Sequence, residues 1–169
     1  MGFFDRFKKQ ETVLPEPLDV SDDAIVAIAD GELIDVKSVS DPMFAEKMMG
    51  ETIAFGYTED KVILCSPANG TLSVMFPTGH AFGITMKNGI QLLVHCGVNT
   101  VETNGDGFRI LNKKQGDSVK AGDPIVEVDM KKLKAKYDMS TMLIVTDAAD
   151  HEIHFIPEQP VKRGQSLTA

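Results

Sequence analysis

The sequence predicts an all-β fold, a β-sandwich or barrel-sandwich with a duplicated motif and short peripheral helices. Short apolar runs alternate with dense turn signals, since the chain holds 14 glycines and 8 prolines. Two pairs of segments also resemble each other along the chain. Turns at such short intervals favour a sandwich or barrel over a chain of alternating strands and helices.

The predicted strands are the apolar runs between these turns. The runs are residues 25–29, 31–39, 52–55, 61–65, 70–76, 81–86, 90–96, 107–110, 124–128 and 142–145.

Two segments interrupt the strands with helical signals. Residues 41–50 begin with Asp41 as N-cap and Pro42 at the first helical position, and they end at Gly50. Residues 129–137, which are rich in lysine, predict a short exposed helix.

The duplication is predicted from two echoes within the chain. Residues 27–33 (AIADGEL) resemble residues 66–72 (SPANGTL), since each has a turn glycine followed by a strand. Residues 119–123 (VKAGD) resemble residues 161–165 (VKRGQ). Two kinds of echo together indicate that each half of the fold supplies an equivalent part of the sandwich.

The 169 residues are expected to form one folded domain, residues 24–169, after an N-terminal segment. Residues 1–9 place three phenylalanines on one side of a helix among basic residues. This pattern predicts a weak peripheral contact with an anionic membrane, or a frayed terminus. Residues 10–23 carry two prolines among acidic residues, a composition typical of a linker.

Composition and charge exclude several classes of function. The net charge is −8 and the pI is near 4.9, which argues against nucleic acid as a partner. No apolar stretch is long enough to span a bilayer, and no secretory signal is evident. Cys65 and Cys96 lack any paired or zinc-type spacing, so free thiols in a reducing cytoplasm are expected.

His95 ends an apolar strand and is the first candidate for chemistry. Strand alternation turns Leu92, Val94 and Cys96 toward the core and His95 to the opposite face. Apolar surroundings favour the neutral imidazole, whose free ring nitrogen is nucleophilic. Gly97 gives backbone access close to the ring, so that a carbonyl there could fix the tautomer. The alternative is a core histidine with satisfied hydrogen bonds.

His80 is the second candidate. In a regular strand, Phe76, Thr78, His80 and Phe82 would share one face, so that the Thr78 hydroxyl could hydrogen-bond to the imidazole. Two imidazoles meeting across neighbouring strands could hold a phosphoryl group on one ring and hydrogen-bond it from the other. Zinc is a competing use of His80 and His95, but it needs a third protein ligand. The pair His151 and His154 is expected to be solvated.

A set of motifs resembles the glucose-family enzyme IIA component of the bacterial phosphoenolpyruvate-dependent sugar phosphotransferase system. The resemblance covers about residues 24–145, with a similar amphipathic opening. The motifs follow one another in the order 41–50 (DPMFAEKMMG), 66–71 (SPANGT), 78–82 (TGHAF), 92–97 (LLVHCG), 100–101 (TV), 105–108 (GDGF) and 119–123 (VKAGD).

The resemblance implies a phosphocarrier of the β-sandwich class. His95 would accept a phosphoryl group through Nε2 from the histidine-containing phosphocarrier protein and donate it to a cysteine of the enzyme IIB domain of a sugar permease. His80, oriented by Thr78, would stabilise the phosphoryl oxygens, and the Gly97 carbonyl would hold the other ring nitrogen of His95. The partners would dock on an apolar patch formed by Met43, Phe44, Met48, Met49, Phe76, Phe82 and Val101.

The expected protein is therefore a cytoplasmic, monomeric phosphotransferase that needs no cofactor, with zinc at His80 and His95 as an adventitious or regulatory ligand. Asn99 stands where the family usually has an aspartate, which leaves room for altered partner choice. Two alternatives stay open. One is a regulatory protein that reports sugar flux through its phosphorylation state, and the other is a zinc-dependent hydrolase-like sandwich.

Overall fold

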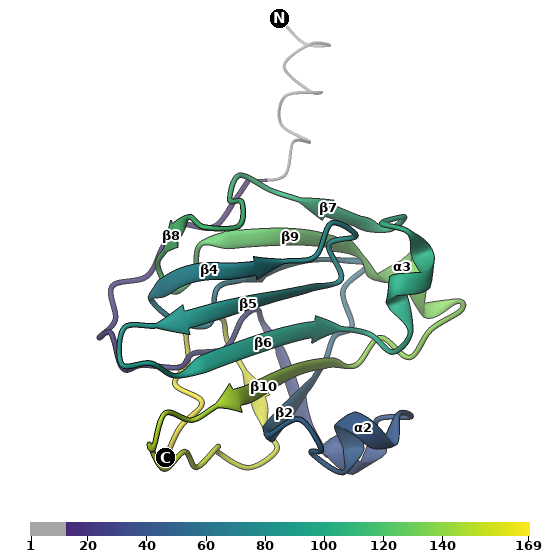
Figure 1. The fold of residues 1–169 in the computed structure, drawn as a ribbon. Helices are drawn as coiled ribbons and strands as arrows, with labels where there is room; N and C mark the ends of the chain where they lie inside the picture. The colour runs from purple at the N-terminus through teal and green to yellow at the C-terminus, as the bar shows by residue number, and fades with distance from the viewer. Residues whose placement is uncertain (1–12) are drawn as a thin grey trace, which may run out of the picture.

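The computed structural model describes residues 13–169, which form two antiparallel sheets around a common core (Figure 1). The larger sheet has eight strands in the order β11-β1-β2-β10-β6-β5-β4-β8, and the smaller has three in the order β3-β9-β7. The predicted β-sandwich is confirmed. The strands are β1 (Gly31–Ile34), β2 (Glu51–Gly56), β3 (Lys61–Cys65), β4 (Gly70–Met75), β5 (Ala81–Met86), β6 (Gln91–Cys96), β7 (Phe108–Ile110), β8 (Ser118–Val119), β9 (Pro124–Asp129), β10 (Thr141–Asp147) and β11 (Pro160–Val161).

Most predicted strands are present, with two exceptions near the start. Residues 25–29 are buried but form no strand, and only Val26 makes an isolated bridge, with Ser166. The run 31–39 ends early, because the Asp35 side chain accepts a hydrogen bond from the Lys37 amide and the chain turns into a 3-10 helix, η1 (Val36–Ser38). A side chain that bonds to its own backbone competes with strand pairing in this way.

Both helical predictions are confirmed in place, but the helices are shorter than expected. Helix α2 (Pro42–Ala45) starts where the Asp41 carboxylate accepts from the Met43 amide, and it stops before Lys47, whose φ is +54°. Helix α3 (Met130–Lys134) is not fully exposed as predicted. Its Met130 and Leu133 side chains are buried in the core while the lysines face solvent.

The predicted duplication is confirmed by equivalent strand pairs. Gly31 of β1 pairs with Val161 of β11, and Gly70 of β4 pairs with Val119 of β8. In each pair, one strand comes from the repeated segments 27–33 and 66–72, and the other comes from the repeated segments 119–123 and 161–165. The echoes in the sequence therefore mark the same structural unit built twice.

Hydrogen bonds between the two units are reciprocal. The Val26 amide donates to the Pro67 carbonyl at 2.8 Å, and the Cys65 amide donates to the Ile28 carbonyl at 2.9 Å. Val26 and Ile28 occupy the same places in the first echo as Cys65 and Pro67 do in the second. Such reciprocal bonds are those expected of two units related by an approximate two-fold axis.

The sequence analysis placed the start of the domain at Ala24, but residues before Ala24 also pack against the domain. The Leu18 amide donates to the Ala121 carbonyl at 2.8 Å. The Leu18 side chain covers the two equivalent turn glycines, Gly122 and Gly164, and a Cβ added at either would come within 2.7 Å of it. Residues 1–9, with the predicted membrane contact, lie outside the described residues. No helix within residues 13–169 is long and apolar enough to span a membrane.

Leu18→Ala should lower the free energy of unfolding by about 1–2 kcal/mol, because it uncovers both turn glycines and removes most of the apolar contact of a half-buried leucine. Denaturant unfolding measures the change. Val13→Ala is the matched control, because Val13 is 89% exposed and should contribute nothing measurable. Equal stability of the two variants would show that residues 13–23 are not part of the folded unit.

Candidate active site

His95 projects from β6 on the face opposite the core, as predicted. Leu92, Val94 and Cys96 of the same strand are buried, whereas His95 is half-buried. Its neighbours across the ladder are Ala81 of β5 and Met142 of β10. The histidine is therefore held at the centre of the larger sheet, on rigid backbone.

A carbonyl oxygen selects the tautomer of His95. Nδ1 lies 2.8 Å from the Gly97 oxygen, so Nδ1 carries the hydrogen and donates it. Gly97 has a φ of +79°, and a Cβ there would come within 2.5 Å of Thr100 and 2.9 Å of Met139. Only glycine fits this turn. In the neutral ring, the bond to its carbonyl leaves the lone pair on Nε2.

His80 lies in the turn between β4 and β5, not in a regular strand as predicted. The Phe76 amide donates to the Ala81 carbonyl, and Gly79 has a φ of +78°. This turn breaks the alternation on which the prediction depended. Phe82 consequently faces the core and is only 1% exposed, although Phe76 is exposed beside His80.

The two imidazoles meet as expected. Their ring centroids are 5.1 Å apart with an interplanar angle of 82°. The predicted Thr78 contact is present, with Oγ1 at 2.5 Å from Nδ1 of His80. The His80 carbonyl also accepts from the Cys96 amide at 2.7 Å, which ties the turn to the strand that carries His95.

Aromatic rings support each histidine from the side. The Phe44 ring of α2 lies 4.9 Å from that of His95, and the Phe76 ring lies 5.2 Å from that of His80. Phe44 is only 2% exposed, so it supports His95 as a buried neighbour and does not offer a docking surface. This corrects the predicted role of Phe44 on the apolar patch, and the burial of Phe82 corrects it likewise.

Burial dominates the electrostatics of the pair. Burial and, to a smaller extent, the neighbouring His80 lower the pKa of His95 to about 4, while the Gly97 carbonyl and Asp41 act in the opposite direction. Burial also lowers the pKa of His80, which is 4% exposed. Both rings are neutral at physiological pH.

Exposed apolar side chains lie on segments that carry or adjoin the two histidines. Five of the seven predicted patch residues are exposed, namely Met43, Met48, Met49, Phe76 and Val101. The sequence analysis missed Val74, which is exposed and lies opposite Gly83 in the β4–β5 ladder. Its signal was the spacing of two residues from Phe76, which directly follows the end of β4. We call the six residues Met43, Met48, Met49, Val74, Phe76 and Val101 the apolar face.

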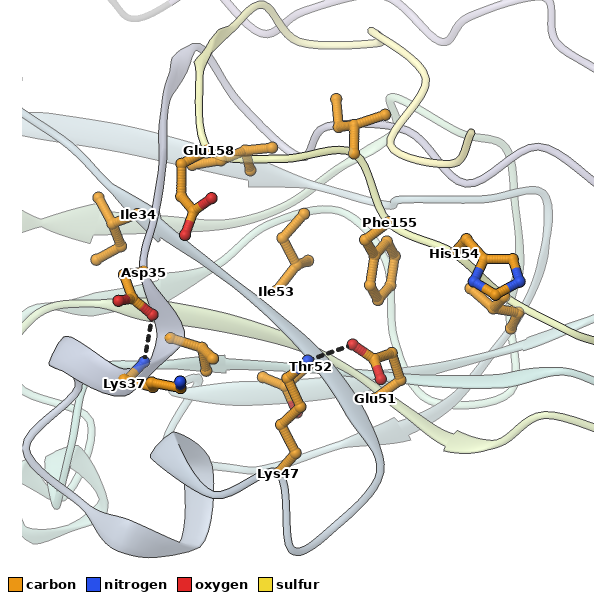
Figure 2. A pocket seen from close by; sticks show the side chains of 14 residues that line it. Ile34, Asp35, Lys37, Lys47, Glu51, Thr52, Ile53, His154, Phe155 and Glu158 are labelled. Carbon is orange, nitrogen blue, oxygen red and sulfur yellow. Dashed lines mark hydrogen bonds and ion pairs between the residues drawn. The ribbon is translucent and has the colours of Figure 1, made fainter.

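A separate cavity of about 510 Å³, lined by neither His80 nor His95, lies between β1, β2 and the segment 153–158 (Figure 2). Its walls combine aliphatic side chains with charges of both signs, including the ion pair between Lys47 and Glu51. None of the predicted site residues lines it. His151 and His154 are exposed, as expected for a solvated pair.

The donor set around His80 and His95 does not extend to a third metal ligand. Across residues 13–169, no cluster of three or more His, Cys, Asp or Glu side chains is arranged to hold a metal ion.

The His95 ring should stay neutral until the pH approaches 4. An unfolded chain takes up this proton near about pH 6.5, so between these values the unfolded state binds a proton that the folded state does not. This group's contribution should leave stability unchanged above pH 6.5 and lower it as the pH falls toward 4. NMR titration of the ring nitrogens checks the value, and a midpoint above pH 6 would contradict the buried, neutral ring. In His95→Gln this part of the pH dependence of unfolding should be absent.

Comparison with known proteins identifies the family and agrees with the fold. The model of the family "phosphoenolpyruvate-dependent sugar phosphotransferase system, EIIA 1" matches residues 23–151. The solved structure of glucose permease IIA from Mycoplasma capricolum superposes with a TM-score of 0.79 at 32% identity, covering 86% of this chain and 93% of that one.

Curated relatives agree with this match. The chain is 38% identical over 144 residues to the glucose-specific EIIA component of Staphylococcus epidermidis, covering 84% of this chain and 85% of the relative. It is 37% identical over 147 residues to that of Staphylococcus aureus, covering 86% and 87%. These similarities favour neither the purely regulatory alternative nor the zinc hydrolase. The chain belongs to the EIIA 1 family of the sugar phosphotransferase system, whose members take a phosphoryl group from the histidine-containing phosphocarrier protein and pass it to enzyme IIB.

Proposed function

We propose that Nε2 of His95 carries the phosphoryl group. The observation that supports this most directly is the hydrogen bond from Nδ1 to the Gly97 carbonyl at 2.8 Å, which leaves the lone pair on Nε2. The ring is also neutral and partly exposed, so no proton has to leave before attack.

Two in-line displacements complete the transfer. The Nε2 lone pair forms a bond to phosphorus as the N–P bond of the donor's phosphohistidine breaks, and the electron pair returns to the donor's ring. The thiolate of the enzyme IIB cysteine then attacks phosphorus, and the breaking N–P bond returns its pair to Nε2. Each step exchanges one bond for another, so catalysis consists mainly of placement and charge stabilisation.

We assign His80 the role of hydrogen-bond donor to the phosphoryl oxygens. When the Thr78 hydroxyl donates to Nδ1, the ring hydrogen lies on Nε2. With the ring centroids 5.1 Å apart, that hydrogen can reach an oxygen held on His95. A preorganised donor of this kind acts on the charge that develops in the transition state.

The apolar face is the proposed docking surface for both partners. Methionine side chains adapt to different partners, and exposed apolar side chains grouped around a reactive residue are typical of an interaction site. The buried Phe44 and Phe82 contribute indirectly, since Phe44 packs beside His95 and Phe82 packs β5 against the core.

Location, oligomeric state and ligands complete the proposal. We propose a cytoplasmic monomer that works without a cofactor, with residues 1–9 making a weak contact with an anionic membrane through Phe3, Phe4 and Phe7. Zinc bound by His80 and His95 would be adventitious or regulatory. The names of the relatives make glucose the first sugar to test.

Incubation with phosphoenolpyruvate and the two general proteins of the system should add one acid-labile phosphoryl group, detected by intact-mass spectrometry. His95→Ala should abolish the adduct because it removes the nucleophile. His154→Ala, which alters an exposed histidine, should keep it. Full labelling of His95→Ala would exclude this residue, and an unlabelled wild-type protein that binds zinc would favour a metal site.

His80→Gln should still accept the phosphoryl group but pass it to enzyme IIB more slowly, by about 10²-fold if the lost contact resembles an oxyanion donor. Rapid-quench kinetics separate the two half-reactions. Thr78→Val keeps the imidazole but removes the hydroxyl that orients it, so it should slow the second half-reaction to a lesser degree. Onward transfer at the wild-type rate in His80→Gln would remove His80 from the mechanism.

A further inference from the structure

Asp138 joins two segments that flank His95 from opposite sides. It lies in the connection between α3 and β10 and is half-buried. One carboxylate oxygen accepts from the amide and hydroxyl of Ser140, at 3.0 and 2.7 Å. The other accepts from the amide of Ser40 at 3.0 Å, although the two residues are 98 positions apart.

The bond to Ser40 fixes the start of α2. Asp41, the next residue, caps this helix through its bond from the Met43 amide. From the helix, Phe44 reaches to within 4.9 Å of the His95 ring, while Met43 is exposed on the apolar face. Ser40 is thus the point at which Asp138 holds the segment that carries part of the proposed docking surface.

On the other side, the same connection holds the turn after β6. The Asp138 carbonyl accepts from the Val98 amide at 2.8 Å, and the Ser140 carbonyl accepts from the Gly97 amide at 2.9 Å. Gly97 in turn receives the hydrogen of His95. The residue that anchors α2 therefore also anchors the turn that sets the tautomer and direction of the imidazole.

The Asp138 carboxylate is suited to holding both segments because it is charged. Burial alone would raise its pKa, but the hydrogen bonds from Ser140 and Ser40 outweigh burial and hold the pKa below its usual value. Hydrogen bonds to an ionised acceptor are shorter and stronger than those between neutral groups.

We propose that Asp138 is a positioning residue for phosphoryl transfer, which keeps the docking surface on α2 in register with the imidazole of His95. This inference rests on the proposed function of His95. A partner seated on α2 would deliver phosphorus in line with Nε2 only while this link is intact. Asp138 acts through Ser40 and Gly97, and its contacts do not include the reacting ring.

The test compares Asp138→Ala and Asp138→Asn with Asp147→Ala. The control is matched, because Asp147 lies at the other end of β10 and accepts a bond from the Ala149 amide two residues on. Asparagine keeps the shape, but its NH₂ group cannot accept from one of the two residues, Ser40 and Ser140, that donate to the Asp138 carboxylate.

Asp138→Ala should lower kcat/KM for transfer from the phosphorylated carrier by about tenfold, since small displacements of reacting groups are costly. The loss should fall mainly on KM, because the docking segment moves. Asp138→Asn should lose less, and Asp147→Ala should match wild type. Wild-type rates in Asp138→Ala, measured below its melting temperature, would overturn the inference.

An NMR measurement on the unphosphorylated protein separates this inference from the proposed function. Loss of the Ser40 link should shift the ring-proton resonances of His95, because Phe44 moves relative to the imidazole. Asp147→Ala should leave them in place. Unchanged His95 resonances in a folded Asp138→Ala would contradict the positioning role, whereas failure of the wild-type protein to accept a phosphoryl group would contradict the assignment of His95 instead.

Discussion

The register between β5 and β6 is the constraint on which the site depends. Ala81 lies opposite His95, so the turn before β5 delivers His80 to the neighbouring imidazole. A slip of one residue would turn His95 into the core and bring Val94 or Cys96 to the surface. The buried alternate residues of both strands oppose such a slip, because each apolar side chain removed from the core costs about 1.5–3 kcal/mol. Hydrophobic packing on one face thereby specifies chemistry on the other.

Each histidine depends on one glycine with positive φ for its hydrogen-bond partner. Gly79 lets the β4–β5 turn close tightly enough to aim His80, and Gly97 turns its own carbonyl back to Nδ1 of His95. A residue with a Cβ would be strained at either position. The rigid strands and the two tight turns do different work, since the strands fix the distance between the rings and the turns fix their hydrogen bonds.

Local patterns predicted the strands, the duplication and both histidines, because each depends on a few consecutive residues. Strand alternation placed His95 correctly, but the same rule failed for Phe82 once the Gly79 turn interrupted it. The Asp41 cap predicted where α2 begins, and only the structure shows that Lys47 ends it early. Asp138 escaped notice because its partner, Ser40, is 98 positions away and neither residue belongs to a motif.

A carrier must release its phosphoryl group as readily as it accepts it, and the surroundings of His95 suit this balance. Burial and His80 disfavour positive charge on the ring, whereas Asp41 favours it and so opposes a bound anion. The proposed stabilisation of the phosphoryl oxygens comes from the neutral donor His80. A cation in that place would stabilise the phosphorylated protein more strongly and slow the onward transfer of the phosphoryl group. Hydrogen bonds from charged groups are roughly twice as strong as those between neutral groups. The charges around His95 therefore favour rapid transfer of the phosphoryl group through His95 over its long retention there.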